Sequence, residues 1–499
     1  MKTFVILEDQ SLASRTVFAV GWAAALQVAR QIYQIVIWVV LARILTPEDY
    51  GLVGMATVVT GFVSTFASMG LSQAIIQRRN LDENHLDVAF WGGLGIGVVL
   101  CIAVIALSPA IAIFYNQPQL RGIVSVASFG FITNALPLVY AAVLQRNLQF
   151  KEVGIVTGSG LLLAMVTAPL MAYSGWGVWS LVIPPLLIGP AGFLVGIKIL
   201  KWRPRVSLQW QKLWELVGFG SNVAGASLLV YIIENLDYLL IGRFLGPGLL
   251  GLYTLAYQIM TLPRIHISSA VAQALFPAMA MIQEDKQRLR NGYLKAVYYV
   301  ASIVFPLMAG LFVVAPEAIS FIYGEQWVPA VPLIRIFCVV GIMHSVGTFV
   351  GSIFKATGRP DIEFRWNLVV LAVFLPMLLV TVQWGIVAVA LGVTCTWLVL
   401  IPIVVSIANR LICLSWQAYL SNLRYPALLS LAMAVFVWVT QSITATLGVD
   451  AGIVLLASIL VGVSFYTGGM WLLDRKSYSE IVHLVFRRKL LIRMADDAG

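Results

Sequence analysis

Four polar side chains lie inside the first long apolar stretch of the chain. Gln27, Arg30, Gln31 and Gln34 all fall within residues 17–41. The three glutamines share one face of a helix, and Arg30 lies beside it. Polar groups at the middle of a bilayer are costly unless they pair internally or face water. The planar guanidinium of arginine donates two parallel hydrogen bonds and suits phosphate. We therefore predict that this face binds an anionic substrate. The alternatives for Arg30 are a structural pair with a neighbouring helix or a side chain that reaches the headgroups.

A second polar group follows a proline in a later apolar stretch. Arg264 and His266 come directly after Pro263, and proline frees a backbone carbonyl and can kink a helix. We predict that Arg264 and His266 contribute to substrate binding and that Pro263 acts as a hinge. Histidine titrates near neutral pH and could carry a proton, but a hydrogen-bonded packing role is the preferred interpretation of His266. Arg335, inside another stretch, is expected to reach the headgroups.

Two carboxylates in a third apolar stretch are candidates for an ion-coupling site. Glu234 and Asp237 are three residues apart and are expected to share a helix face. Carboxylates at such a depth could hold Na⁺ or a proton. Asn367 and Thr394 are further candidate oxygen ligands from two later stretches. In the alternative interpretation, Asp237 pairs with Arg243 or lies in the headgroup layer.

Long apolar stretches must position these side chains. Of the 499 residues, 60% are hydrophobic and 11% are charged, and the mean hydropathy is +0.92, whereas a soluble domain carries about 25% charged residues. Stretches of about 20 apolar residues can cross a hydrocarbon core of about 30 Å as helices. We count fourteen, at residues 17–41, 49–77, 86–114, 120–143, 152–173, 177–199, 215–241, 248–275, 292–315, 329–354, 362–380, 384–408, 425–445 and 450–473. The predicted fold class is therefore an all-α integral membrane protein with 14 transmembrane helices.

The basic residues alternate between the two sides of these predicted spans. The formal net charge is +10, and 26 of the 32 Lys and Arg lie in the two tails, in the even-numbered gaps or within three residues of a span end that borders such a gap. The odd-numbered gaps hold three, Arg43, Arg121 and Arg243, and the remaining three fall inside spans. This positive-inside pattern places both termini in the cytoplasm. It also argues against nucleic-acid binding, because the charge follows membrane topology.

A short motif occurs twice in the chain. Residues 42–52 match residues 242–252 at an offset of 200, with Arg, Leu, Pro, Gly and Leu in identical register. Each copy ends one span and begins the next, so a Pro/Gly corner has been used twice. We predict that Pro47 and Pro247 lie at corners where two lobes rock, because a duplicated bundle with a cleft between its halves is typical of transporters.

The duplication predicts two six-helix lobes followed by two extra helices. The expected parts are an N-terminal lobe (1–197), a cytoplasmic linker (198–214), a C-terminal lobe (215–412), spans 13 and 14 (424–473) and a cytoplasmic tail (474–499). Each lobe has an even number of crossings, so the first helix of each lobe enters the membrane from the same side. A pseudo-twofold axis would then lie along the membrane normal. In the linker, Trp202 and Trp210 suit the membrane interface.

Several motifs resemble the polysaccharide transporter branch of the multidrug/oligosaccharidyl-lipid/polysaccharide flippase superfamily. They are residues 42–51 (ARILTPEDYG), 270–279 (AVAQALFPAM), 285–289 (DKQRL), 293–296 (YLKA), 305–310 (FPLMAG), 323–332 (YGEQWVPAVP) and 356–361 (ATGRPD). The resemblance runs from about residue 12 to 475 and is greatest to exporters of the colanic-acid type, related to exopolysaccharide and lipopolysaccharide synthesis. The motifs are specific to the branch but not to one sugar.

The resemblance implies a function and a set of partners. It implies translocation of undecaprenyl-diphosphate-linked oligosaccharide from the cytoplasmic to the periplasmic leaflet of the bacterial inner membrane, by alternating access. Arg30 and Arg264 would then hold the diphosphate between two cations. We expect no cofactor other than a coupling H⁺ or Na⁺. The expected partners are the lipid-linked oligosaccharide, the bilayer and a polysaccharide polymerase or export machinery.

Two rival classes make different demands on the sequence. Cation-coupled efflux of drugs would need carboxylates and aromatics for organic cations, but the charge inside the spans is split between both signs. A membrane glycan polymerase or ligase would need a large periplasmic loop, and the odd gaps 114–120 and 316–328 are too short. No glycine-rich nucleotide loop ends in Lys-Ser or Lys-Thr. The four cysteines lack metal-ligand spacing. We therefore expect a transporter, not an enzyme, without a resident metal.

Overall fold

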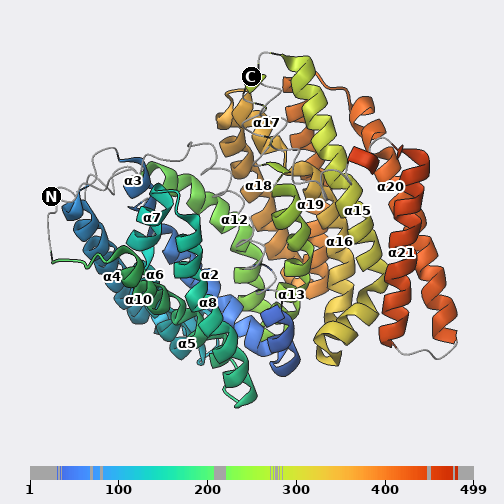
Figure 1. Cartoon of the computed structure of the whole chain (residues 1–499). Helices are drawn as coiled ribbons and strands as arrows, with labels where there is room; N and C mark the ends of the chain where they lie inside the picture. The colour runs from blue at the N-terminus through green and yellow to red at the C-terminus, as the bar shows by residue number, and fades with distance from the viewer. Residues whose placement is uncertain are drawn as a thin grey trace. The chain divides into compact units, whose positions relative to one another are not determined.

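The fold is described from a computed structural model of the chain (Figure 1). The structure describes residues 36–67, 71–78, 82–206, 221–269, 285–446, 451–475 and 478–480, together with positions 31, 34, 271, 272, 275, 279 and 281–283. Within these residues every regular element is a helix, as the composition predicts. The chain divides into two compact units, Met1–Thr254 and Leu255–Gly499. The lobe boundaries predicted above, with a linker at 198–214, stay a prediction.

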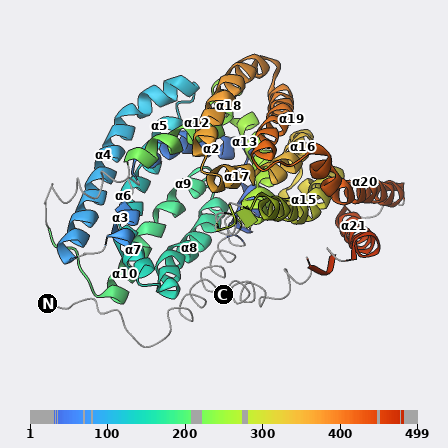
Figure 2. The ribbon, with the colours of Figure 1, turned by 90° about the horizontal axis from the view of Figure 1, so that it is seen from above.

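In the first unit, some helices pack against neighbours in the sequence and others against helices far away in the sequence. They are α2 (Pro47–Ala67), α3 (Leu71–Gln77), α4 (Glu83–Tyr115), α5 (Leu120–Ala127), α6 (Phe129–Ala135), α7 (Leu138–Arg146), α8 (Phe150–Tyr173), α9 (Trp179–Leu186), α10 (Ile188–Leu200), α12 (Ser221–Leu245) and the first half of α13 (Pro247–Pro263). Helix α4 packs along α5 and α6, and α8 packs along α10 (Figure 2). Helix α12 packs on α2, although more than 150 residues separate them in the sequence.

The second unit is built around one long helix. Its elements after α13 are a π-helical turn (Arg264–Ser268), α15 (Lys286–Tyr323), a 3₁₀ turn (Glu325–Ala330), α16 (Val331–Gly347), α17 (Val350–Ala356), α18 (Pro360–Thr381), a 3₁₀ turn (Val382–Trp384), α19 (Ile386–Leu411), α20 (Trp416–Thr446) and α21 (Ala451–Leu473). Helix α15 packs against α16 and α20, and α20 packs against α21 (Figures 1 and 2). Helices α18 and α19 pair beside α16.

Local chemistry explains where several helices begin. The Asp82 carboxylate accepts the His85 N–H at 2.8 Å and caps α4. Asp285 caps α15 in the same way, through N–H groups at 3.0 Å. Helix α18 begins at Pro360, after Gly358 at φ +70°. There Arg359 pairs with Asp361 (Nε to Oδ1 3.1 Å), and this neighbouring carboxylate raises the pKa of the Arg359 guanidinium. The Gly-Arg-Pro-Asp motif is thus a helix-starting turn.

Some predicted spans are broken into shorter helices at prolines. The apolar stretch 120–143 forms α5, α6 and α7, with Pro137 immediately before the last of these. The stretch 177–199 forms α9 and α10, with Pro184 and Pro185 near the break. Proline removes a backbone donor and its ring crowds the preceding turn, so breaks at these points are expected.

The structure has eleven helical segments that are long and apolar enough to cross a membrane, among the residues it describes. They coincide with eleven of the fourteen predicted stretches, those numbered 2 to 6 and 9 to 14. The other three, 17–41, 215–241 and 248–275, each include residues outside the described part of the chain. The chain is therefore a multi-pass α-helical membrane protein.

The start of the predicted linker is packed into the first unit. Trp202 is 9% exposed and lies with Phe90 and Tyr140 in an aromatic cluster of that unit. The Tyr140 hydroxyl donates to the Trp202 carbonyl at 3.3 Å, and the Arg205 N–H donates to the Asp87 carboxylate at 2.9 Å. The Trp202 ring therefore packs inside the protein, and its predicted level at the membrane interface stays a prediction. Trp210 lies outside the described residues.

Candidate functional site

The two copies of the corner motif meet each other within the first unit. A Cβ added to Gly51 of α2 would lie 1.8 Å from the Pro247 carbonyl oxygen. A Cβ added to Gly251 of α13 would lie 1.8 Å from the Pro47 carbonyl oxygen. Each glycine therefore lets the start of the other helix approach to backbone contact, which a larger residue would prevent. The sequence predicted two equivalent corners, and the structure brings them into reciprocal contact.

Helix α12 is joined to the middle of α2 by a tyrosine. The Tyr231 hydroxyl donates to the carbonyls of Thr57 and Val58 at 3.2 and 2.9 Å. Its ring lies 6.4 Å from that of Phe62 and covers Gly61. Tyr231 therefore ties α12 to backbone acceptors of α2.

The two candidate coupling carboxylates lie in different surroundings on α12. Asp237 is 2% exposed and accepts the Tyr253 hydroxyl at 2.7 Å and the Tyr238 N–H at 2.9 Å. Glu234 is exposed. The two side chains therefore differ in exposure, although residues three apart are neighbours on a helix surface, and their joint role in ion coupling stays a prediction. Arg243 lies over the Phe114 ring at 5.6 Å, and among the described residues no ion pair joins it to Asp237, so the alternative pairing is not found in the structure.

The first predicted binding group is only partly within the described residues. Gln27 and Arg30 lie outside them. Gln31 is half-buried and Gln34 is exposed. The binding role of all four residues stays a prediction.

Arg264 and His266 lie in the short π-helical turn that follows Pro263. Both side chains are half-buried, and the turn packs against α16. The Ser269 hydroxyl donates to the Arg264 carbonyl at 3.1 Å and so gives this carbonyl a hydrogen-bond donor within the π-helical turn. A π-turn at this position agrees with the helix distortion expected of Pro263. His266 Nδ1 is buried without a hydrogen-bond partner among the described residues, so the hydrogen bond expected at that atom is not found.

The remaining predicted residues occupy the second unit. Asn367 is half-buried on α18, and Thr394 is buried on the neighbouring α19. The Thr394 hydroxyl donates to the Ala390 carbonyl of its own helix at 2.8 Å, which leaves its oxygen lone pairs available as acceptors. Arg335 Nε donates to the Phe312 carbonyl at 3.1 Å, and its guanidinium lies 5.8 Å from the Phe312 ring. Arg335 is therefore tied to α15.

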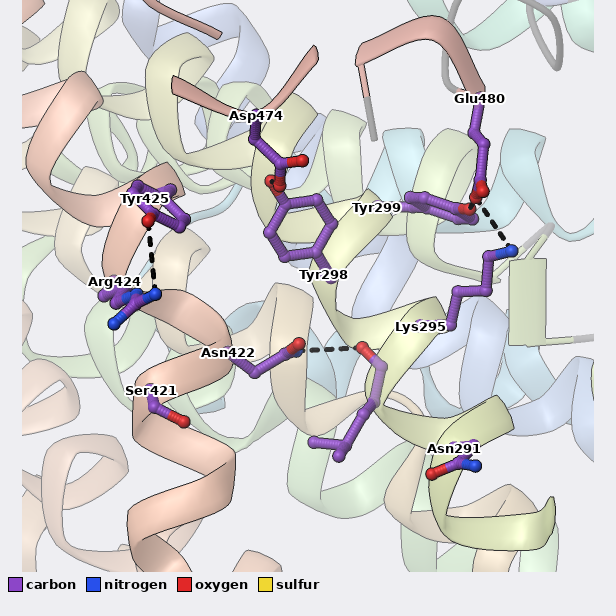
Figure 3. Close-up of a pocket in the computed structure, with 11 residues that line it drawn as sticks. Asn291, Lys295, Tyr298, Tyr299, Ser421, Asn422, Arg424, Tyr425, Asp474 and Glu480 are labelled. Atoms are coloured by element: carbon purple, nitrogen blue, oxygen red, sulfur yellow. Dashed lines mark hydrogen bonds and ion pairs between the residues drawn. The ribbon is translucent and has the colours of Figure 1, made fainter. Parts of the chain in front are cut away.

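A polar pocket of about 480 Å³ lies where α15, α20 and the segment after α21 meet (Figure 3). It is lined by Asn291, Leu294, Lys295, Tyr298, Tyr299, Ser421, Asn422, Arg424, Tyr425, Asp474 and Glu480. Sequence reasoning missed this site, since its three segments are far apart in the chain. One available signal was the spacing of Lys295, Tyr298 and Tyr299, which places three donors on one side of a helix.

The fold resembles solved structures of transporters over most of their length. The inward closed lipid II flippase MurJ has a TM-score of 0.74 at 13% identity, with 91% of this chain and 98% of that chain covered. An inward-facing multidrug resistance MATE family transporter of the MOP superfamily has a TM-score of 0.62 at 18% identity, with 76% and 94% covered. At such identities the likeness shows the fold alone.

Sequence comparisons narrow this class to one family. A model of the family described as polysaccharide biosynthesis protein matches residues 40–332. Lipopolysaccharide biosynthesis protein WzxC of Escherichia coli K12 is 30% identical over 439 residues, which are 84% of this chain and 86% of that protein. Teichuronic acid biosynthesis protein TuaB of Bacillus subtilis 168 is 28% identical over 467 residues, 91% and 95% of the two chains. The chain belongs to the polysaccharide biosynthesis protein family, and the resemblance noted in its sequence is confirmed.

Proposed function

We propose that this chain is a flippase that moves an oligosaccharide linked to undecaprenyl diphosphate from the cytoplasmic to the periplasmic leaflet of a bacterial inner membrane. This proposal rests on two similarities taken together, one of sequence and one of fold. The sequence matches a polysaccharide biosynthesis family over more than half of the chain. The fold matches a lipid II flippase over 91% of the chain. The chain acts as a transporter in polysaccharide synthesis and not as an enzyme.

The proposed architecture has fourteen spans in two six-helix lobes and a C-terminal pair. Eleven candidate spans coincide with predicted stretches, and this supports the full count. The reciprocal contact of Gly51 with Pro247 and of Gly251 with Pro47 supports a pseudo-twofold relation between the lobes. Both termini would be cytoplasmic, from the distribution of basic residues.

The proposed substrate site combines the polar residues of two apolar stretches. Arg30 and Arg264 would each place a guanidinium on the diphosphate, with Gln27, Gln31, Gln34 and His266 around the headgroup. A guanidinium suits this role because it stays charged in a partly dehydrated cavity and donates two parallel hydrogen bonds. The half-buried Arg264, set in a π-helical turn after Pro263, supports a site at this level. The corners at Pro47 and Pro247 and the turn at Pro263 would allow the lobes to rock.

An ion gradient is proposed to drive the cycle. Glu234 and Asp237 on α12, with Asn367 and Thr394 as oxygen ligands from the other lobe, would bind H⁺ or Na⁺ in one of the two access states. The burial of Asp237, with one hydroxyl donor at 2.7 Å, supports a carboxylate whose protonation matters to the packing around it. No resident metal or cofactor is required by this scheme.

The test is a translocation assay in proteoliposomes. Full-length protein is reconstituted with a fluorescent undecaprenyl-diphosphate oligosaccharide, and loss of outer-leaflet label is measured with and without a pH or Na⁺ gradient. We expect protein-dependent translocation that one of the two gradients accelerates. Arg264→Gln and Arg30→Gln are each expected to reduce the rate at least about tenfold, since each removes a charge-assisted contact to phosphate.

A matched control separates binding from general loss of charge. Arg335→Gln removes a cation from α16 whose guanidinium contacts Phe312 of the neighbouring helix, so it should leave the rate within about twofold. If Arg30→Gln and Arg264→Gln both translocate as the parent does, the two-cation site is wrong. If no lipid-linked oligosaccharide moves but an organic cation does, the function is efflux of soluble compounds instead.

A further inference from the structure

The pocket at the start of α15 has two chemically different walls (Figure 3). On one wall, two carboxylates from the segment after α21 are already held by donors of α15. Glu480 accepts Lys295 Nζ at 2.8 Å and also the Tyr299 hydroxyl. Asp474 accepts the Tyr298 hydroxyl at 2.6 Å. Glu480 is therefore neutralised by Lys295, and Asp474 is hydrogen-bonded to a neutral hydroxyl.

The opposite wall carries a cation that faces neutral groups. Arg424 of α20 is exposed, and its described contacts are with Tyr425, whose hydroxyl lies 3.1 Å from Nη2 and whose ring centre lies 4.6 Å from the guanidinium carbon. Asn422 donates its amide to the Leu294 carbonyl at 2.9 Å, and its side-chain oxygen is left as an acceptor. A guanidinium can bind a phosphate group, and the neighbouring amide and hydroxyl groups can bind the hydroxyls of a polyol esterified to that phosphate.

Helix α15, whose first part lines this pocket, is longer than a hydrocarbon core is thick. Helix α15 has 38 residues, and at 1.5 Å per residue it is about 57 Å long, against a hydrocarbon core of about 30 Å. Residues 291–299 lie within its first fourteen residues. Trp471 lies near the end of α21, and the Arg475 guanidinium carbon lies 5.3 Å from the centre of its ring. Tryptophan is enriched at membrane interfaces. A ligand here would approach from the membrane surface.

We propose that this pocket binds the headgroup of an anionic lipid, with its phosphate ester on Arg424 and its hydroxyl groups on the amide and carboxylate oxygens around it. The cavity of about 480 Å³ accommodates a phosphate and a small polyol. Two lipids share this chemistry: phosphatidylglycerol of the bilayer, and a polyprenyl phosphate that carries sugar. The site lies wholly within the second unit, and its lining includes neither Arg264 nor His266 of the proposed substrate site.

The test measures lipid retention by the purified full-length protein. Phosphatidylglycerol, phosphatidylcholine and a polyprenyl-phosphate sugar are added separately in detergent, and the bound fraction is measured by native mass spectrometry. Arg424→Gln is expected to weaken binding of the anionic lipid about tenfold, and Arg424→Lys to restore part of it. Glu480→Gln should instead strengthen binding about two- to fivefold, because it releases Lys295 from its carboxylate partner.

Arg288→Gln is the control, since Arg288 is an exposed cation at the start of α15 that pairs with Asp285 and does not line the pocket. It should bind lipid as the parent does. Retention of phosphatidylglycerol that depends on Arg424 assigns the site to bilayer lipid. Retention of the polyprenyl-phosphate sugar alone assigns it to the lipid-linked glycan. Equal binding by Arg424→Gln and the parent, or equal losses in Arg424→Gln and Arg288→Gln, would overturn the proposal. The assay measures no transport, so its failure leaves the flippase proposal intact.

Discussion

The two copies of the corner motif reach the same helix contact through different local chemistry. In the first copy, the Thr46 N–H donates to the Asp49 carboxylate at 3.0 Å, and the Asp49 N–H donates to the Thr46 hydroxyl at 3.3 Å. This is a reciprocal cap of the kind that stabilises helix starts. In the second copy the equivalent position is Gly246, at φ +83°, a conformation that favours glycine. Proline at the first helical position and glycine four residues later are common to both.

A tyrosine secures each corner, again in a different way. The Tyr50 hydroxyl donates to the Trp38 carbonyl at 3.2 Å, and the two rings are 4.7 Å apart. In the second copy the Tyr253 hydroxyl donates to the buried Asp237 carboxylate at 2.7 Å. A hydrogen bond to a buried charge is worth more than one to a carbonyl. The comparison shows that the close approach of the two helix starts uses glycine and proline in both copies, whereas the hydrogen bonds around each corner differ.

Substitution of either corner glycine should have the largest effect. Gly51→Val and Gly251→Val each place a side chain 1.8 Å from a backbone oxygen, so each should destabilise the protein by more than about 3 kcal/mol. The measurement is equilibrium unfolding in mixed detergent micelles. Gly54→Ala is the control, because its Cβ would lie 3.5 Å from Leu250, an ordinary contact. If Gly51→Val were as stable as Gly54→Ala, the reciprocal contact would not be part of the folded structure.

Removal of the two tyrosine hydroxyls should have unequal effects. Tyr253→Phe removes the hydroxyl donor of the buried Asp237 and leaves it the Tyr238 N–H, so it should cost about 1–3 kcal/mol, whereas Tyr50→Phe should cost about 1 kcal/mol. The same unfolding measurement checks both. In the double variant Tyr253→Phe with Asp237→Asn, the loss should be smaller than the sum of the single losses, because the charge has also been removed. Additive losses would show that the two residues do not interact.

Loss of the first-copy cap should have the smallest effect. Asp49→Ala removes the carboxylate that accepts the Thr46 N–H and should cost about 1 kcal/mol. Asp49→Asn should recover most of that loss, because an amide oxygen is also an acceptor. Glu48→Ala, at the neighbouring exposed position, should change stability less. A larger effect from Glu48 than from Asp49 would mean that charge at the helix start matters more than the cap.

Much of the fold could be predicted because hydrophobic runs report directly on membrane crossing. The stretch 86–114 corresponds to α4, and 384–408 corresponds to α19. Breaks inside a span were harder to predict, since a proline such as Pro316 lies within the continuous α15, whereas Pro137 lies at a break. Whether a proline interrupts a helix depends on the packing of its neighbours. The environments of the site residues were also beyond prediction.

The amino-acid sequence by itself determined the class of protein, the positions of the apolar helices, the repeated corner and the family. These properties follow from local composition and from motifs that are contiguous in the chain. Only the tertiary structure decided which partners those residues have. It buried Trp202, gave Asp237 a tyrosine 16 residues away, and brought Tyr298 within 2.6 Å of Asp474 across 176 residues. Such contacts depend on how helices pack against one another, and helical periodicity alone does not specify which faces meet.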